Sequence, residues 1–190
     1  MSSHYSQIPL NFWNESYENE WIIGQSNEQA TSTVLNATGQ IFLCGPKFCG
    51  KKHLAHKMNV RLQFVHLMDD AKIIAEYDAY QVNKEKVIWI SSQEITNVYG
   101  QGREVSKDVA SRLNSMQRAE IFELTDDMLF ALLNKRLASI GFVVRNEIIN
   151  YCIHRMPRTY IAVEECVAFI KKMNRVSLKD FREFFEREFV

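Results

Sequence analysis

The chain has 190 residues, a formal net charge of zero and 46% hydrophobic residues. A chain of this length and composition can bury a core, which excludes an intrinsically disordered protein. The balanced charge argues against a broad electrostatic grip on nucleic acid, so no direct sequence-specific DNA binding is expected. The four cysteines form no CxxC pair, and the sequence shows no hydrophobic leader or long apolar run. We therefore expect a cytoplasmic protein with free thiols and no membrane segment.

The first two thirds of the chain predict an α/β fold. Short apolar runs bounded by glycine or polar residues indicate buried strands, and Ser26 can cap the first helix with its hydroxyl. A strand, a turn and a helix repeated in this way are typical of a parallel sheet. The expected elements are an extended arm over 1–24, helices over 27–35, 51–58 and 69–76, and strands over 41–44, 62–67 and 87–91.

From Thr125 onward the pattern changes to helices alone. Leucines spaced three and four residues apart give one apolar face, Thr125 can cap the first turn, and Gly141 can end the helix. Further helices are expected over 145–155 and 159–174, and from Ser177, where Asp180 completes a motif like a capping box. The predicted domains are an arm over 1–24, an α/β core over 25–122 and a helical domain over 123–190.

Residues 45–52, Gly-Pro-Lys-Phe-Cys-Gly-Lys-Lys, match the phosphate-loop pattern GxxxxGK between a predicted strand and a predicted helix. In the intact motif, backbone amides and the lysine hold phosphate, and a following serine or threonine hydroxyl binds Mg²⁺. Gly45, Gly50 and Lys51 are kept, but Lys52 stands at the hydroxyl position. An ammonium has no lone pair for a metal ion, so no metal is expected, although Lys52 could partly neutralise phosphate.

Further departures weaken the expected chemistry. Phe48 stands where such loops often have glycine, and a side chain is unfavourable there if the backbone needs a positive φ. Asp69 and Asp70 follow a predicted strand as a metal-binding acid would, but they fit a helix start better. A second candidate strand over 79–83 ends in Asn83 instead of an acid. We therefore do not expect a self-sufficient ATPase. Two hypotheses stay open: a loop that holds ADP or ATP weakly and without Mg²⁺, and a loop kept for structure alone.

His53 and His56 lie three residues apart on a predicted helix and would form one half of a metal site. No carboxylate or thiol stands at matching spacing on that helix, so ordinary core or exposed histidines are expected.

Five stretches around and after the loop carry a resemblance to a known family. They are 21–27 (Trp-Ile-Ile-Gly-Gln-Ser-Asn), 53–55 (His-Leu-Ala), 87–93 (Val-Ile-Trp-Ile-Ser-Ser-Gln), 108–113 (Asp-Val-Ala-Ser-Arg-Leu) and 155–158 (Arg-Met-Pro-Arg). In this order they resemble the DnaA-related branch of the AAA+ ATPases, and in particular its Hda-like regulators, over nearly the whole chain.

The resemblance implies roles for individual residues. Ile23 and Gly24 would border the adenine, and Gln93 would stand in the sensor I region where DnaA carries an acid. Arg112 would be the arginine finger, and Arg158 the sensor II arginine. The nucleotide-binding residues expected on this basis are Ile23, Gly24, Gly45, Gly50, Lys51, Lys52 and Arg158.

The resemblance also implies the architecture, a P-loop AAA+ core followed by a small all-helical lid. Residues 53–86 between the loop and the sensor I strand are fewer than the family's strands and helices would occupy. We therefore expect a trimmed parallel sheet with doubtful Walker B chemistry. The family's terminal DNA-binding helices are expected to be absent, because the chain stops just after the lid.

The segment Gln7-Ile8-Pro9-Leu10-Asn11-Phe12 resembles the hexapeptide by which Hda-like proteins bind the DNA polymerase III sliding clamp. In such an extended peptide Gln7 would supply hydrogen bonds, while Ile8, Leu10 and Phe12 would fill apolar pockets. The alternative is an arm whose apolar residues pack on their own domain.

Taken together, the resemblance implies a regulator of replication initiation. It would bind the sliding clamp and DnaA, and would promote hydrolysis of DnaA-bound ATP by presenting Arg112 in trans. The alternative is an AAA+-fold adaptor that is unresponsive to nucleotide and has no catalytic effect. Either hypothesis allows a homodimer. A third alternative, a self-sufficient NTPase or kinase, is disfavoured by Lys52 and by the missing acid.

Overall fold

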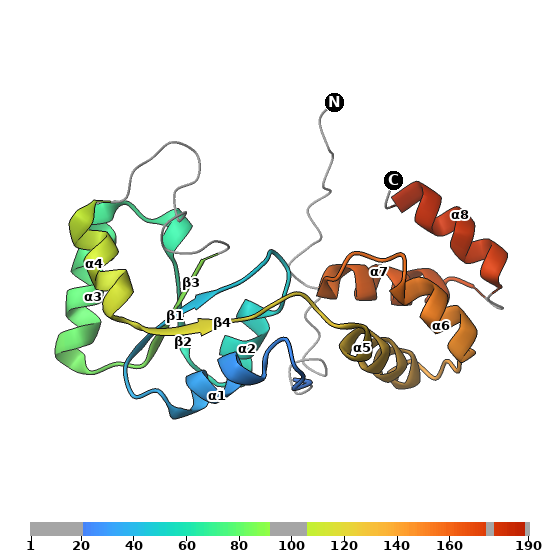
Figure 1. Ribbon diagram of the computed structural model, residues 1–190, viewed down its shortest axis with the longest axis horizontal. Coiled ribbons are helices and arrows are strands. Elements are labelled where there is room, and N and C mark those ends of the chain that lie inside the picture. Colours follow the sequence, from blue (N-terminus) through green and yellow to red (C-terminus); the bar gives the residue numbers. More distant parts are fainter. Residues whose placement is uncertain (1–20, 92–105, 174–176, 189–190) are drawn as a thin grey trace.

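The computed structural model describes residues 21–91, 106–173 and 177–188. Within these ranges a four-stranded parallel sheet lies between two layers of helices, and four further helices follow it as a separate group (Figure 1). None of the helices described is long and apolar enough to cross a membrane. The elements are α1 (Glu28–Asn36), β1 (Gln40–Cys44), α2 (Lys51–Lys57), β2 (Arg61–Phe64), η3 (Val65–Leu67), α3 (Asp70–Asn83), β3 (Val87–Ile90), α4 (Lys107–Ser115), β4 (Gln117–Glu120), α5 (Asp126–Ser139), α6 (Asn146–Ile153), α7 (Tyr160–Lys171) and α8 (Leu178–Glu188).

The strands lie in the order β2-β3-β1-β4, and every pairing is parallel. The central strand β1 is buried along its whole length, since it pairs with β3 on one side and β4 on the other. The carboxyl ends of parallel strands meet at one edge of a sheet. The phosphate loop after β1 therefore lies at the same edge as the ends of β2 and β3.

Side chains of the central strands alternate between two apolar clusters, as the two-residue period of a strand requires. Phe42 and Trp89 join the buried residues of α3 and α4, and Ile41 and Ile88 join those of α1 and α2. The fully buried Trp89 also donates from Nε1 to Gln40 Oε1 at 2.9 Å, which satisfies its one polar atom. The two clusters hold the sheet between its helical layers.

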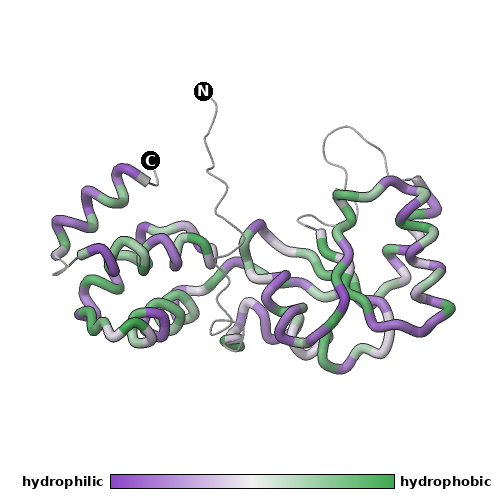
Figure 2. Tube along the Cα trace, turned by 180° about the vertical axis from the view of Figure 1, so that it is seen from behind, coloured by the Kyte–Doolittle hydropathy of each residue, from purple (hydrophilic) through white to green (hydrophobic). Residues whose placement is uncertain are grey.

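The helical part has its own core, because α5, α6, α7 and α8 all contribute to one apolar cluster. Hydrophobic and hydrophilic residues alternate along these helices in Figure 2, as expected for helices that bury one face. The predicted cap at Thr125 is confirmed, since its hydroxyl accepts from Met128 N at 3.4 Å. Thr159 caps α7 in the same way by accepting from Ala162 N at 3.2 Å. Ser177 and Asp180 also bond reciprocally at the start of α8.

The predicted fold class, an α/β parallel-sheet core followed by helices, is confirmed, and the structure corrects four details. The strand predicted over 62–67 ends at Phe64 and is followed by the 3-10 turn η3. Ser26 does not cap α1, since its hydroxyl donates to Met128 Sδ at 2.9 Å and Asn27 takes the cap position. The candidate strand over 79–83 belongs to α3, which continues to Asn83. The strand β4 was not predicted, because only one residue of its Gln-Arg-Ala-Glu sequence, Ala119, is buried.

Candidate functional site

The phosphate loop between β1 and α2 depends on two glycines with positive φ, Gly45 at 147° and Gly50 at 101°. A Cβ on Gly45 would lie 2.2 Å from the carbonyl oxygen of Ile121, and one on Gly50 would lie 2.8 Å from the ring of Tyr160. Phe48 has a φ of 60°, in the left-handed region. A positive φ at this position is what makes a side chain there unfavourable, as was expected from the sequence. The loop is therefore closely packed on both sides.

Lys51 turns back into its own loop. Its ammonium donates to the carbonyls of Gly45 at 2.7 Å and Pro46 at 2.5 Å, and it lies 3.6 Å from the sulfur of Cys49. The side chain is buried, and this desolvation lowers the pKa of Lys51. Burial likewise raises the pKa of the Cys49 thiol. A phosphate could reach this ammonium only by competing with the two loop carbonyls.

Lys52 faces an aromatic ring instead of an acid. Its exposed ammonium lies 4.9 Å from the centroid of the Phe64 ring, and Phe64 is the last residue of β2. Attraction between an ammonium and a ring face holds this pair together. Neither group can ligate Mg²⁺, and no cluster of three or more metal-ligating side chains occurs among the described residues. Sequence reasoning missed Phe64, because it placed this residue inside a strand expected to run over 62–67, whereas β2 ends at Phe64.

The two acids considered as metal ligands begin helices, as predicted. Asp69 caps α3 by accepting from Lys72 N at 2.8 Å. Asp70 accepts through Oδ2 from the amide of Ser106, the cap residue of α4, at 3.2 Å. Both carboxylates therefore lie at helix starts, although Asp70 Oδ1 is buried and has no hydrogen-bond partner among the described residues.

Three rings cover the N-terminus of the loop helix: Trp21, His53 and Tyr160, here called the ring cluster. Trp21 stacks on Tyr160 with 6.5 Å between centroids and 16° between planes. His53 meets Trp21 edge-on at 5.3 Å and Tyr160 at 6.2 Å. The backbone amide of Tyr160 also donates to the Phe48 carbonyl at 3.1 Å. The first turn of α7 is thereby fastened to the phosphate loop.

The segment that was expected to border the adenine runs beside α5. The amide of Gly24 donates to Asn27 Oδ1 at 2.9 Å, and a Cβ on Gly24 would lie 2.6 Å from Met128 Cγ. Ile23 is 59% exposed. Of this segment it is Trp21 that lies over the loop helix, within the ring cluster.

Arg158 lies at the junction between the core and the helices. Its guanidinium donates to the Leu124 carbonyl at 3.0 Å and pairs with Asp126 at 2.7 Å. A different arginine, Arg136 on α5, is close enough for its charge to act on His53 and Tyr160 in the ring cluster. Sequence reasoning did not single out Arg136, which also pairs with Glu164 on α7 at 2.8 Å.

Arg112 lies on the other side of the core, one turn before the end of α4. Its Nε and Nη2 donate to the two carboxylate oxygens of Asp78 at 3.3 Å each, and its Nη1 bonds to Asp108. Since β4 starts just after α4, Arg112 is near the amino edge of the sheet, whereas the phosphate loop is at the carboxyl edge. Arg112 and the chain's own phosphate loop therefore lie at opposite edges of the sheet.

Two predicted elements cannot be placed. The clamp-like residues Gln7, Ile8, Leu10 and Phe12, and the sensor I residue Gln93, lie outside the described residues.

The fold is shared with solved structures. Domain III of the replication initiation protein DnaA from Thermotoga maritima is 11% identical over 90% of this chain and 95% of that chain, with a TM-score of 0.72. AMPPCP-bound DnaA from Aquifex aeolicus is 18% identical, with 93% of this chain and 71% of that chain covered and a TM-score of 0.70. The Thermotoga maritima RuvB Holliday junction branch migration motor is 13% identical, with 86% and 69% covered and a TM-score of 0.61.

No protein-family model and no curated protein matches the sequence. At identities this low the structural likeness establishes the fold alone. It is a four-stranded parallel α/β core followed by a group of four helices, an arrangement that this chain shares with the DnaA structures.

The hydroxyl of Tyr160 offers a direct test of the ring cluster. It is buried and has no hydrogen-bond partner among the described residues. Tyr160→Phe should therefore raise the free energy of unfolding, by about 1 kcal/mol, because it removes an unsatisfied polar group. Tyr77→Phe is the matched control and should lower it by about 0.5–1.5 kcal/mol, since that hydroxyl bonds to Ser115 at 2.8 Å. Urea denaturation measures both, and a clear loss for Tyr160→Phe would contradict the packing described.

The ring cluster also predicts a pH dependence. Burial, with the nearby charges of Arg136, His56 and Lys57, lowers the pKa of His53 from 6.5 to about 4. As the pH falls below 6.5 the unfolded chain binds a proton that the folded chain does not, so stability is lost between pH 6.5 and pH 4. The free energy of unfolding falls by at most about 3 kcal/mol over this range.

Denaturation at several pH values measures this loss. His53→Gln should remove it, whereas His56→Gln, on the exposed side of the same helix, should keep it. An unchanged pH profile in His53→Gln would show that His53 is not the group responsible.

Proposed function

We propose that this chain is an Hda-like regulator of replication initiation, which promotes hydrolysis of ATP bound to DnaA and does not turn over ATP of its own. The observation that carries the proposal is the separation of Arg112 from the chain's own phosphate loop by the length of the sheet. An arginine finger acts on a phosphate held by a neighbouring molecule, and such a finger accelerates phosphoryl transfer by about 10³–10⁵.

The state of the chain's own loop supports this division of labour. Lys51 is bonded to loop carbonyls, and Lys52 faces Phe64 where an Mg²⁺ ion would need a hydroxyl and an acid. In this proposal ADP or ATP binds weakly and without Mg²⁺, if at all, through Gly45, Gly50 and Lys51. Arg158 would contribute little, because its guanidinium is bonded at the junction.

The arm supplies the second partner in this proposal. Gln7, Ile8, Leu10 and Phe12 would bind the DNA polymerase III sliding clamp as an extended peptide, with side chains filling pockets. Attachment to a clamp on DNA would place the chain where DnaA is to be inactivated. A protein of this kind would work in the cytoplasm without sequence-specific contacts to DNA.

A second function is favoured by one observation, the two ion pairs of Arg112. An arginine bound to both Asp78 and Asp108 is a typical bridge between surface helices. The alternative is therefore an AAA+-fold adaptor that binds the clamp or DnaA and has no effect on hydrolysis.

ATP hydrolysis by the cognate DnaA, measured with clamp-loaded DNA, separates the two functions. The wild-type chain should stimulate hydrolysis, and Arg112→Ala should lose nearly all of this stimulation. Arg61→Ala is the control, since Arg61 also forms an ion pair at the surface, with Glu85 at 3.1 Å. Equal stimulation by wild type and Arg112→Ala would rule out the finger.

The Gln7→Ala, Leu10→Ala double variant tests the arm in the same assay. It should require more protein for half-maximal stimulation and should be captured less by immobilised clamp. Capture equal to that of the wild type would sink the clamp proposal while leaving the finger result intact.

A further inference from the structure

Arg112 is held on three sides. Asp78 on α3 accepts two hydrogen bonds from the guanidinium, and Asp108 on α4 accepts a third. The guanidinium carbon lies 5.8 Å from the centroid of the Tyr77 ring. Only 22% of the arginine side chain is exposed, whereas the side chains of Asp78 and Asp108 are 55% and 59% exposed. The guanidinium thus packs against α3 and α4 and does not extend into solvent.

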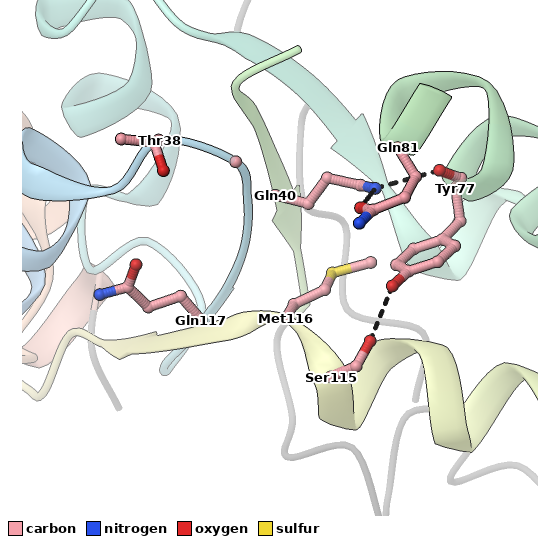
Figure 3. Close-up of a pocket in the computed structure, with 8 residues that line it drawn as sticks. Thr38, Gln40, Tyr77, Gln81, Ser115, Met116 and Gln117 are labelled. Atoms are coloured by element: carbon pink, nitrogen blue, oxygen red, sulfur yellow. Dashed lines mark hydrogen bonds between the residues drawn. The ribbon is translucent and has the colours of Figure 1, made fainter. Parts of the chain in front are cut away.

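The support beneath the guanidinium is also fixed. The Tyr77 hydroxyl bonds to Ser115 Oγ at 2.8 Å, and the Ser115 hydroxyl donates to the Arg112 carbonyl at 2.7 Å. Figure 3 shows Tyr77 at the wall of a pocket of about 330 Å³, where its carbonyl accepts from Gln40 Nε2 at 3.0 Å. Tyr77 is therefore anchored by both its ring and its backbone, so it provides a firm base for the arginine.

The two carboxylates differ in what they restrain. Asp108 lies four residues before Arg112 on the same helix, so this pair can stay together if the guanidinium swings outward. Asp78 belongs to α3, and its two bonds tie the guanidinium across to a different helix. An extended Arg112 must therefore give up Asp78 before it gives up Asp108.

We propose that Asp78 is a positioning residue, a latch that keeps the Arg112 guanidinium folded against α3 until the arginine is drawn to a phosphate on another molecule. The inference rests on the proposed finger function and adds its regulation. The latch lowers the fraction of molecules whose finger is extended, and binding to a partner must displace it.

The first test needs no partner. Phenylglyoxal reacts with accessible arginines, and mass spectrometry gives its rate at Arg112. Asp78→Ala should raise this rate by about two- to fivefold, the range over which a partly exposed ion pair shifts an equilibrium. Glu85→Ala removes an exposed carboxylate from another arginine pair, so it should leave the rate at Arg112 unchanged. A rate in Asp78→Ala no higher than in Glu85→Ala would overturn the latch.

The second test uses DnaA-dependent ATP hydrolysis. With the latch removed, Asp78→Ala should reach half-maximal stimulation at a protein concentration about two- to fivefold lower than the wild type. A weaker stimulation by Asp78→Ala would overturn the latch, because it would mean that Asp78 presents the finger. Equal stimulation by wild type and Arg112→Ala would instead reject the proposed function, and the labelling rates would still decide whether Asp78 restrains Arg112.

Discussion

The ammonium of Lys51, bonded to the carbonyls of Gly45 and Pro46, determines how the rest of the carboxyl edge is built. A buried cation must find acceptors, and the loop supplies them by wrapping around it. That conformation places Phe48 in the left-handed region and leaves its carbonyl free to accept from the amide of Tyr160. The start of α7 is thus bonded to a loop that is closed around its own lysine.

The two edges of the sheet consequently have different chemistry. At the carboxyl edge, Lys51 is bonded within the loop, Lys52 faces Phe64, and the ring cluster covers the start of α2. At the amino edge, Arg112 lies at the surface between two exposed carboxylates. In the function we propose, Arg112 acts on a nucleotide held by another protein. In the adaptor alternative, Arg112 stays bound to α3.

Much of the fold could be predicted from local patterns. The cap at Thr125 and the apolar run of β1 are signals within a few residues, and the structure contains both of them. The strand β4 escaped because an edge strand needs few apolar residues. The contacts at the site could not be predicted for another reason. Lys52 contacts Phe64, and Trp21 contacts Tyr160, only after the sheet and the helical part have assembled. The spacing of residues along the chain does not predict such pairs, because their members are far apart in the sequence.

The most direct test of the account is the melting temperature of the isolated chain, measured against ADP and ATP with and without Mg²⁺ and combined with an assay for phosphate release. A ligand that binds the native state raises the melting temperature, and the rise grows with the logarithm of its concentration relative to its dissociation constant. Because Lys51 is bonded within its loop and Lys52 cannot ligate a metal, Mg²⁺ should add nothing to any effect of nucleotide, and no phosphate should be released. A large rise in melting temperature that requires Mg²⁺ together with ATP, accompanied by steady hydrolysis, would contradict the account.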